Sequence, residues 1–238
     1  MKHITIILAF LMTLSSPVEA QGFFTGVNAY QTGDYATALK EWKPLAEQGS
    51  HDAQHNLGLL YQFGQGVPQD YKEAAKWFKL AAEQGVAASQ TALAQIYRNG
   101  NGVARDYKEA AKWYELAAEQ EVDSAQYNLG VLYLNGLGVP QDNKEAAKWF
   151  KLAAEQGWES AQYNLAQMYR NGIGVAEDFK EAVKWYKLAA EQENAEAQSK
   201  LGEMYGNGMG LRQDDTMAHM WFNIGAANGD DLGKKIKK

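Results

Sequence analysis

The sequence contains no cysteine, which excludes disulfide bonds, thiol catalysis and cysteine ligation of a metal. Basic residues are outnumbered, with 23 Lys and Arg against 29 Asp and Glu, and the net charge of −6 argues against a basic face for nucleic acid. Neither Gly-x-Ser-x-Gly nor Ser-x-x-Lys occurs, so the usual short motifs of serine acyl-transfer enzymes are missing. Long apolar runs are missing too, apart from one near the N-terminus.

That apolar run belongs to a segment that differs from the rest of the chain. Lys2 and His3 precede the run at 4–14, and a polar stretch then ends in Ala20. A basic start, a short apolar core and small residues before a cut are typical of a secretory signal peptide. Because the run is too short to span a bilayer comfortably, we expect cleavage after Ala20 and no membrane span afterwards. The protein is therefore predicted to be periplasmic or secreted.

The rest of the chain repeats one pattern at a period of 36 residues. The segment KEAAKWFKLAAEQG at 72–85 returns, with few changes, from residues 108, 144 and 180. Copies at a fixed spacing without insertions predict a repeat array, which is one continuous unit however long it grows. The predicted parts are a signal peptide at 1–20, a degenerate N-terminal repeat at 21–49, repeats at 50–85, 86–121, 122–157, 158–193 and 194–229, and a charged C-terminal tail at 230–238.

Each copy contains two helical patterns, which the third copy shows clearly. Ala125, Leu129 and Leu132 recur at spacings of three and four, and with Tyr133 they form the apolar stripe of a first helix. The loop NGLGVPQD follows, and its glycines and Pro140 are expected to end this helix. The sequence therefore predicts an all-α chain of helix-turn-helix repeats.

The second helix of the third copy is expected to begin at Asp142. Glu145 follows three residues later, and an Asp that accepts backbone N–H groups while a Glu reaches back is a capping-box-like start. The same device recurs as Asp70/Glu73, Asp106/Glu109 and Asp178/Glu181. In the fifth copy Met217 follows Asp214 in place of Glu, so a weaker cap is predicted there.

Small and aromatic residues recur in register along these helices. One hairpin cannot bury its apolar stripe alone, so each copy needs a neighbour, and the alanines of the second helix allow close approach. We expect the recurring aromatic residues to form the core between repeats. They are Trp77, Trp113, Trp149, Trp185 and Trp221 on the second helices, and Tyr61, Tyr97, Tyr133, Tyr169 and Tyr205 on the first helices.

The recurring pattern is A-x-x-x-L-G/A-x-x-Y-x-x-G-x-G-V-x-x-D-x-x-x-A-x-x-W-Y/F-x-x-A-A-x-x-G, and it resembles the Sel-1-like repeat family, a relative of the tetratricopeptide repeats. The resemblance covers residues 22–229 and implies a right-handed α/α solenoid that acts as an adaptor for partner proteins. It also implies that the face formed by the first helices lines the inside of the curve. The cysteine-rich branch of this family is associated with β-lactam binding or slow hydrolysis, and the lack of cysteine means that this activity is not carried over.

One stretch resembles a catalytic metal site. His51 and His55 lie four residues apart with Asp52 beside the first, a spacing similar to H-E-x-x-H of zinc proteases. However, both histidines lie at repeat positions that vary freely among the copies, and a third metal ligand and a catalytic base are missing. We therefore predict no metal, no cofactor and no catalytic residues, and the protein is not expected to be an enzyme.

Partner binding is expected at the columns that change from copy to copy. On the first helices these columns lie at spacings of four and three, hence on one helix face. In the third copy they hold apolar residues at positions that are polar in the copies on either side. The predicted partner-binding residues are Arg98, Tyr127, Val131, Leu134, Trp158, Tyr163, Gln167 and Arg170. Trp158 occupies a column that otherwise holds Ser, Val or Asn, and it could serve as an interface anchor or pack on the preceding turn.

Together these features predict an exported adaptor or scaffold that binds a peptide or helix of another exported or envelope protein. The alternative function is weak hydrolysis or binding of cell-wall-related small molecules such as β-lactams. No nucleic-acid partner is expected. A monomer is predicted, with dimerisation through an open C-terminal end as the alternative, because only the short charged tail follows the last repeat.

Overall fold

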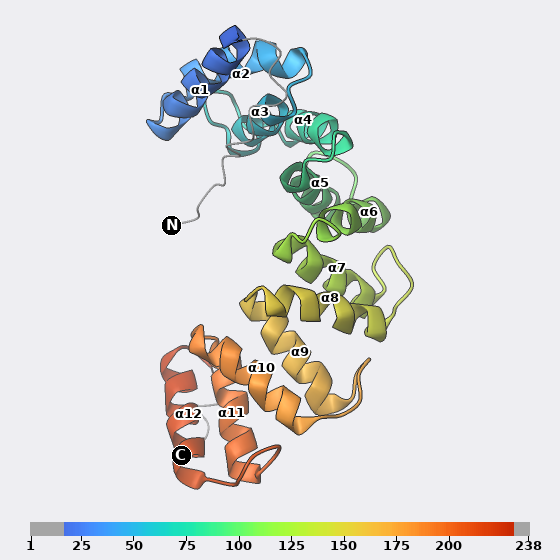
Figure 1. Cartoon of the computed structure of the whole chain (residues 1–238), viewed down its shortest axis with the longest axis vertical. Coiled ribbons are helices and arrows are strands. Elements are labelled where there is room, and N and C mark those ends of the chain that lie inside the picture. The colour runs from blue at the N-terminus through green and yellow to red at the C-terminus, as the bar shows by residue number, and fades with distance from the viewer. Residues whose placement is uncertain (1–16, 231–238) are drawn as a thin grey trace. The chain divides into compact units, whose positions relative to one another are not determined.

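A computed structural model of the chain describes residues 17–230 (Figure 1). Most of the predicted signal peptide and residues 231–238 of the predicted tail lie outside the described residues. Between 17 and 230 the chain forms twelve α-helices and no strands, joined as helix-turn-helix pairs at the predicted 36-residue period. The predicted fold class, an all-α chain of solenoid-type repeats, is confirmed.

The helices fall into two compact units, Met1–Gln120 and Glu121–Lys238. Unit 1 contains α1 (Pro17–Gln31), α2 (Tyr35–Glu47), α3 (His51–Phe63), α4 (Tyr71–Glu83), α5 (Ala87–Asn99) and α6 (Tyr107–Ala118). Unit 2 contains α7 (Asp123–Asn135), α8 (Asn143–Glu155), α9 (Glu159–Asn171), α10 (Phe179–Glu191), α11 (Ala195–Asn207) and α12 (Asp215–Ala227). Within each unit the second helix of a hairpin packs on its hairpin partner and on the first helix of the next hairpin, as α8 does on α7 and α9.

Glycines end the first helix of each repeat, as predicted. Gly136 after α7 adopts a left-handed conformation with φ of 64°, and its N–H donates to the carbonyl of Leu132. A residue with a side chain would be strained in this conformation. Further along the loops, a Cβ atom added at Gly174 would overlap the backbone carbonyl of Asn143 at the start of α8. The loop glycines therefore both end a helix and allow one repeat to approach the next.

The second helix of each repeat begins at the predicted aspartate. Oδ1 of Asp142 accepts from the backbone N–H groups of Lys144 at 2.9 Å and Glu145 at 3.1 Å. The reciprocal half of the predicted capping box is wrong, because the N–H of Asp142 donates instead to the carbonyl of Tyr133. The glutamates at the position of Glu145 form side-chain hydrogen bonds instead, as Glu181 shows. Oε2 of Glu181 accepts from the indole Nε1 of Trp185 at 3.1 Å and from Lys184 Nζ at 3.3 Å.

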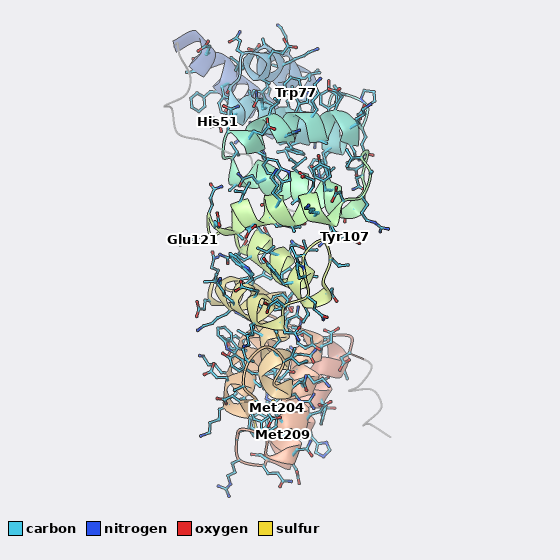
Figure 2. All side chains as sticks on the ribbon, turned by 90° about the vertical axis from the view of Figure 1, so that its right-hand side faces the viewer. His51, Trp77, Tyr107, Glu121, Met204 and Met209 are labelled. Atoms are coloured by element: carbon cyan, nitrogen blue, oxygen red, sulfur yellow. The ribbon has the colours of Figure 1, made fainter. Side chains whose placement is uncertain are left out.

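The core between helices is built mainly from the ring that follows each recurring tryptophan. Phe78, Tyr114, Phe150 and Tyr186 are fully buried. The expectation that every Trp and Tyr of the recurring columns is core requires correction. Trp77, Trp113 and Trp185 are buried, whereas Trp149 and Trp221 and the whole tyrosine column are only partly buried. The side chains, with Trp77 labelled on α4, are drawn on the ribbon in Figure 2.

A buried amide column also connects successive hairpins, and the sequence arguments did not identify it. Gln162 at the start of α9 donates from Nε2 to the carbonyl of Ala154 at 3.2 Å, and its Oε1 accepts from Gln192 Nε2 at 2.9 Å. The equivalent Gln54 makes the same two bonds, to Ala46 and from Gln84. Because a buried amide without partners is costly, these bonds specify how one hairpin stacks on the next.

The core also alternates between two packing arrangements. In the first, third and fifth repeats a glycine of the first helix lies against a phenylalanine of the second, and a Cβ added at Gly130 would lie only 2.8 Å from the ring of Phe150. In the second and fourth repeats these columns hold alanine and tyrosine, and an arginine follows on the first helix. The alternating sets are Gly58/Phe78, Gly130/Phe150 and Gly202/Phe222 against Ala94/Arg98/Tyr114 and Ala166/Arg170/Tyr186.

Candidate functional site

The apolar residues predicted to bind a partner lie on one helix, α7 in unit 2. Tyr127, Val131 and Leu134 are partly buried and pack against the core of this unit while keeping part of their surface accessible. The ring of Tyr127 lies 5.8 Å from that of Phe150. These three residues are called the α7 patch below; all three pack on the core, and Tyr127 does so against the buried ring of Phe150.

Trp158 lies immediately before α9 and contacts the same patch. Its ring centroid is 5.9 Å from that of Tyr127, with the two planes tilted by 32°. The helix that follows has no side-chain cap, because the indole replaces the capping side chain that Asn194 supplies to α11. Trp158 thus packs in part on Tyr127 of α7, a contact that neither sequence-based interpretation named, and it remains partly accessible.

Among the polar residues predicted on α9, Arg170 is held by an ion pair within unit 2. Arg170 Nη2 lies 3.1 Å from Glu203 Oε2 on α11, and Lys200 Nζ lies 2.8 Å from the other oxygen of the same carboxylate. Tyr163 lies beside this group, with its ring centroid 5.9 Å from that of Tyr186. Burial raises the pKa of the Tyr163 hydroxyl, and nearby carboxylates raise it further. The guanidinium of Arg170 therefore bridges two repeats, and Gln167 lies partly buried on the same helix.

Arg98 belongs to unit 1 and occupies the same column as Arg170. It is partly buried on α5, and its Nε donates to Asn99 Oδ1 at 3.4 Å. Burial raises the pKa of the neighbouring Tyr114 hydroxyl to about 12, and the charge of Arg98 opposes that rise. Both arginines thus accompany a buried tyrosine, in keeping with the alternating core.

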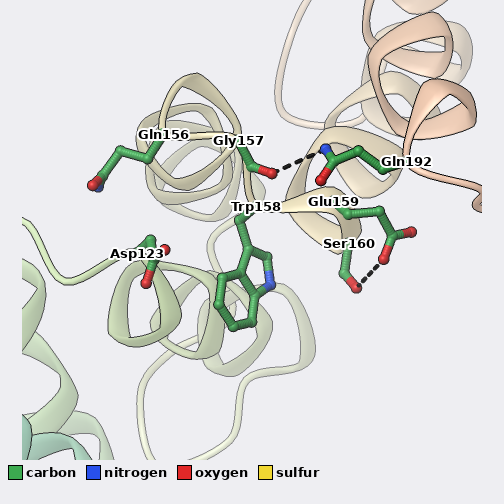
Figure 3. A pocket seen from close by; sticks show the side chains of 7 residues that line it. All are labelled: Asp123, Gln156, Gly157, Trp158, Glu159, Ser160 and Gln192. Carbon is green, nitrogen blue, oxygen red and sulfur yellow. Dashed lines mark hydrogen bonds between the residues drawn. The ribbon is translucent and has the colours of Figure 1, made fainter. Parts of the chain in front are cut away.

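A pocket of about 330 Å³ opens beside Trp158 where the turns between hairpins of unit 2 meet (Figure 3). Its walls are Asp123, Gln156, Gly157, Trp158, Glu159, Ser160 and Gln192. Figure 3 shows the indole of Trp158 between the carboxylate of Asp123 on one side and that of Glu159 on the other. Glu159 is held in place, since its carboxylate accepts from the side-chain amide of Asn194 and lies 3.5 Å from Ser160 Oγ. Sequence reasoning identified only Trp158 of this set.

The histidines of the HDAQH stretch are engaged separately in unit 1. Nδ1 of His55 forms a 2.7 Å hydrogen bond with Ser89 Oγ, while Nδ1 of His51 lies 2.9 Å from Asp52 Oδ1. His55 is only 2% exposed, and burial lowers its pKa from 6.5 to about 4. Over residues 17–230 no group of three or more His, Asp or Glu side chains is placed to hold a metal ion. None of the described helices is long and apolar enough to cross a membrane.

Comparison with known proteins identifies the family to which these repeats belong. The family described as Sel1 repeat matches at residues 51–86, 87–122, 123–158, 159–194 and 195–230. The chain therefore belongs to the Sel1 repeat family. Proteins of this family generally mediate protein–protein interactions, and the fold is a typical non-enzymatic interaction scaffold.

Two solved structures share both fold and sequence with the chain. The c5321 protein, a protective antigen of uropathogenic Escherichia coli strains, is 36% identical with a TM-score of 0.87, over 91% of this chain and 47% of that one. A Sel1 repeat protein from Oxalobacter formigenes is 34% identical with a TM-score of 0.84, over 90% of this chain and 88% of that one.

A curated relative matches over a shorter segment. DAP3-binding cell death enhancer 1 from Rattus norvegicus is 38% identical over 47 residues, which is 20% of this chain and 9% of that protein. The chain thus spans about half of the E. coli structure and a small part of the rat protein.

Proposed function

We propose that the protein is an exported adaptor that binds a peptide or helix of another exported or envelope protein, and that the α7 patch is the centre of its binding surface. The observation that carries this proposal is that Val131 and Leu134 keep accessible apolar surface at columns where the fold accepts polar residues. The equivalent positions on α9 hold Gln167 and Arg170. Because the repeat does not require apolar side chains at these columns, a partner is the reason we give for them.

The surroundings of the patch support a protein ligand. Tyr127 and Trp158 extend the apolar surface with two rings in contact, and Arg170 and Tyr163 lie on the neighbouring α9 of the same unit. Aromatic residues and arginine are the side chains that most often dominate binding energy at protein interfaces. A tyrosine anchored on Phe150 also loses little conformational entropy when a partner binds.

The test uses substitutions that other repeats already contain. Val131→Gln and Leu134→Arg introduce the residues of the fourth repeat. Because Leu134→Arg separates an arginine from the alanine and tyrosine of its alternating set, the thermal unfolding of the double variant is measured to check that it is folded. As a matched control, Leu152→Ala and Leu188→Ala remove two leucines of the second helices that are each 37% exposed. Proteins captured from the envelope or culture medium of the source organism by the native protein are identified, and their affinities for all three proteins are measured.

We expect a captured partner to bind the patch variant at least about tenfold more weakly and the control variant as tightly as the native protein. Equal affinities for the native protein and the patch variant would show that the partner binds elsewhere. Sedimentation of the native protein at increasing concentration tests the accompanying proposal that it is a monomer and does not pair through its C-terminal end.

A further inference from the structure

The pocket beside Trp158 offers a ligand mainly hydrogen-bond acceptors. Nε2 of Gln156 donates to the carbonyl of Glu121 at 3.0 Å and to Gln126 Oε1 at 2.9 Å. Nε2 of Gln192 likewise donates to the carbonyl of Gly157 at 3.0 Å and to Gln162 at 2.9 Å. A primary amide has two N–H groups, so both amides have used their donors within the fold. The amide oxygens remain for a ligand, as does the spare acceptor capacity of two carboxylates, since Asp123 Oδ1 accepts from the N–H of Ser124 and Glu159 accepts from Asn194 and Ser160. The indole N–H is an added donor.

The charge around the pocket has one sign. Asp123 and Glu159 are the charged residues among its walls. The turns at 155–160 and 191–196 add glutamates and contain no Lys, Arg or His. Glu155 is paired with Lys151 at 3.8 Å, so the field at the pocket comes mainly from Asp123 and Glu159. These two carboxylates would attract a positively charged ligand and repel an anion.

The fold does not require this arrangement. The equivalent turn in unit 1, 72 residues earlier, keeps the two glutamines as Gln84 and Gln120 but has Val86 and Ala87 in place of Trp158 and Glu159, and His51 in place of Asp123. The amides are thus part of the stacking of hairpins, while the ring and the two acids are additions found at this turn of unit 2. The indole packs on Tyr127 and the carboxylate of Glu159 accepts from Asn194, yet the equivalent turn of unit 1 stacks without the ring or either acid.

We propose that this pocket binds the guanidinium group of an arginine in an extended segment of the partner, an inference that rests on the proposed function. A guanidinium carries five donors and no acceptor, which matches walls made of carboxylate and amide oxygens. Its planar face can stack on the indole of Trp158, and its edge can pair with Asp123 or Glu159. Since Trp158 also contacts Tyr127, the arginine would bind at the border of the α7 patch.

The inference can be tested without knowing the partner. The ¹⁵N-labelled protein is titrated with the peptide acetyl-Gly-Gly-Arg-Gly-Gly-amide, and the indole N–H signals are followed by NMR. The signal of Trp158 is assigned from its loss in Trp158→Val, which introduces the residue found at 86 and 122. The matched control ligand is the same peptide with citrulline, which has nearly the same shape and no charge. The double variant Asp123→Asn/Glu159→Gln removes both carboxylates, and its thermal unfolding checks that it is folded.

The arginine peptide is expected to shift the Trp158 signal saturably, about tenfold more tightly than the citrulline peptide, and the double variant should lose that preference. No saturable shift, or equal shifts with both peptides, would overturn the inference. This result is separate from the test of the proposed function. A partner that is lost with the α7 patch variant but held equally by the double variant would support the adaptor and contradict the arginine site. Saturable binding of the arginine peptide, together with no captured protein partner, would support the arginine site and contradict the adaptor.

Discussion

Replacing Gly130 by alanine tests the packing of the core directly. Gly130 lies inside α7, where alanine is intrinsically favoured over glycine by about 1 kcal/mol. The added Cβ, however, would lie 2.8 Å from Cδ1 and Cε1 of Phe150 and 3.3 Å from the carbonyl of Ala146. Phe150 is fully buried and has little room to move. Overpacking of this kind costs about 1–3 kcal/mol, so we expect a net loss of roughly 0–2 kcal/mol.

The control is Gly206→Ala in α11 of the same unit. There the nearest atom to the added Cβ is Cβ of Ala218 at 3.6 Å, an ordinary contact, so only the propensity gain of about 1 kcal/mol remains. The free energies of unfolding of both variants are measured by urea denaturation followed by circular dichroism, with the slopes of the transitions compared because repeat proteins can unfold in parts. The two variants should differ by about 1–3 kcal/mol.

A further variant tests whether the alternating sets are coupled. Gly130→Ala/Leu134→Arg/Phe150→Tyr introduces the residues of the fourth repeat, Ala166, Arg170 and Tyr186, into the third. If these residues form a set, the triple variant should recover at least half of any loss caused by Gly130→Ala alone. The reasoning is refuted if Gly130→Ala stabilises the protein as much as Gly206→Ala does.

Two further predictions concern pH and helix caps. The pKa of His55 falls from 6.5 to about 4 on folding. The stability of the folded protein is therefore unaffected by this group above pH 6.5, and it decreases as the pH falls from 6.5 towards 4, because the unfolded chain takes up the proton first. The free energy of unfolding, measured by urea titration, should fall by about 3 kcal/mol over this range. Buried Asp52, whose pKa is raised, reduces this loss. His55→Thr should remove the part of the pH dependence that is due to His55. Asp142→Ala removes two hydrogen bonds to backbone N–H groups and Asp214→Ala removes one, so thermal unfolding should show a loss of about 1–2 kcal/mol for the first and a smaller loss for the second.

Much of the fold could be predicted because the same structural signals recur in successive copies of the repeat. Apolar spacing, loop glycines and cap aspartates such as Asp142 act locally, so each can be read from a short segment. The weaker cap predicted at Asp214 matches its single bond from Met217. The second half of the capping box failed because the N–H of Asp142 is already used by Tyr133, a residue of the preceding helix.

The parts that sequence reasoning missed depend on contacts between hairpins. Gln162 recurs as faithfully as the tryptophans, yet its role requires knowing that Ala154 and Gln192 lie on either side of it. The pocket beside Trp158 likewise combines residues of successive turns, and only their stacking places Asp123 near the indole. One signal was available in the sequence, namely the strict recurrence of a polar residue among buried columns.

The measurement that most directly tests the central claim is the affinity of a captured partner for the native protein, for Val131→Gln/Leu134→Arg and for Leu152→Ala/Leu188→Ala. If the α7 patch is the binding surface, the first double variant should bind at least about tenfold more weakly while the second binds like the native protein. Equal binding by the native protein and the α7 patch variant, with both folded, would contradict the account.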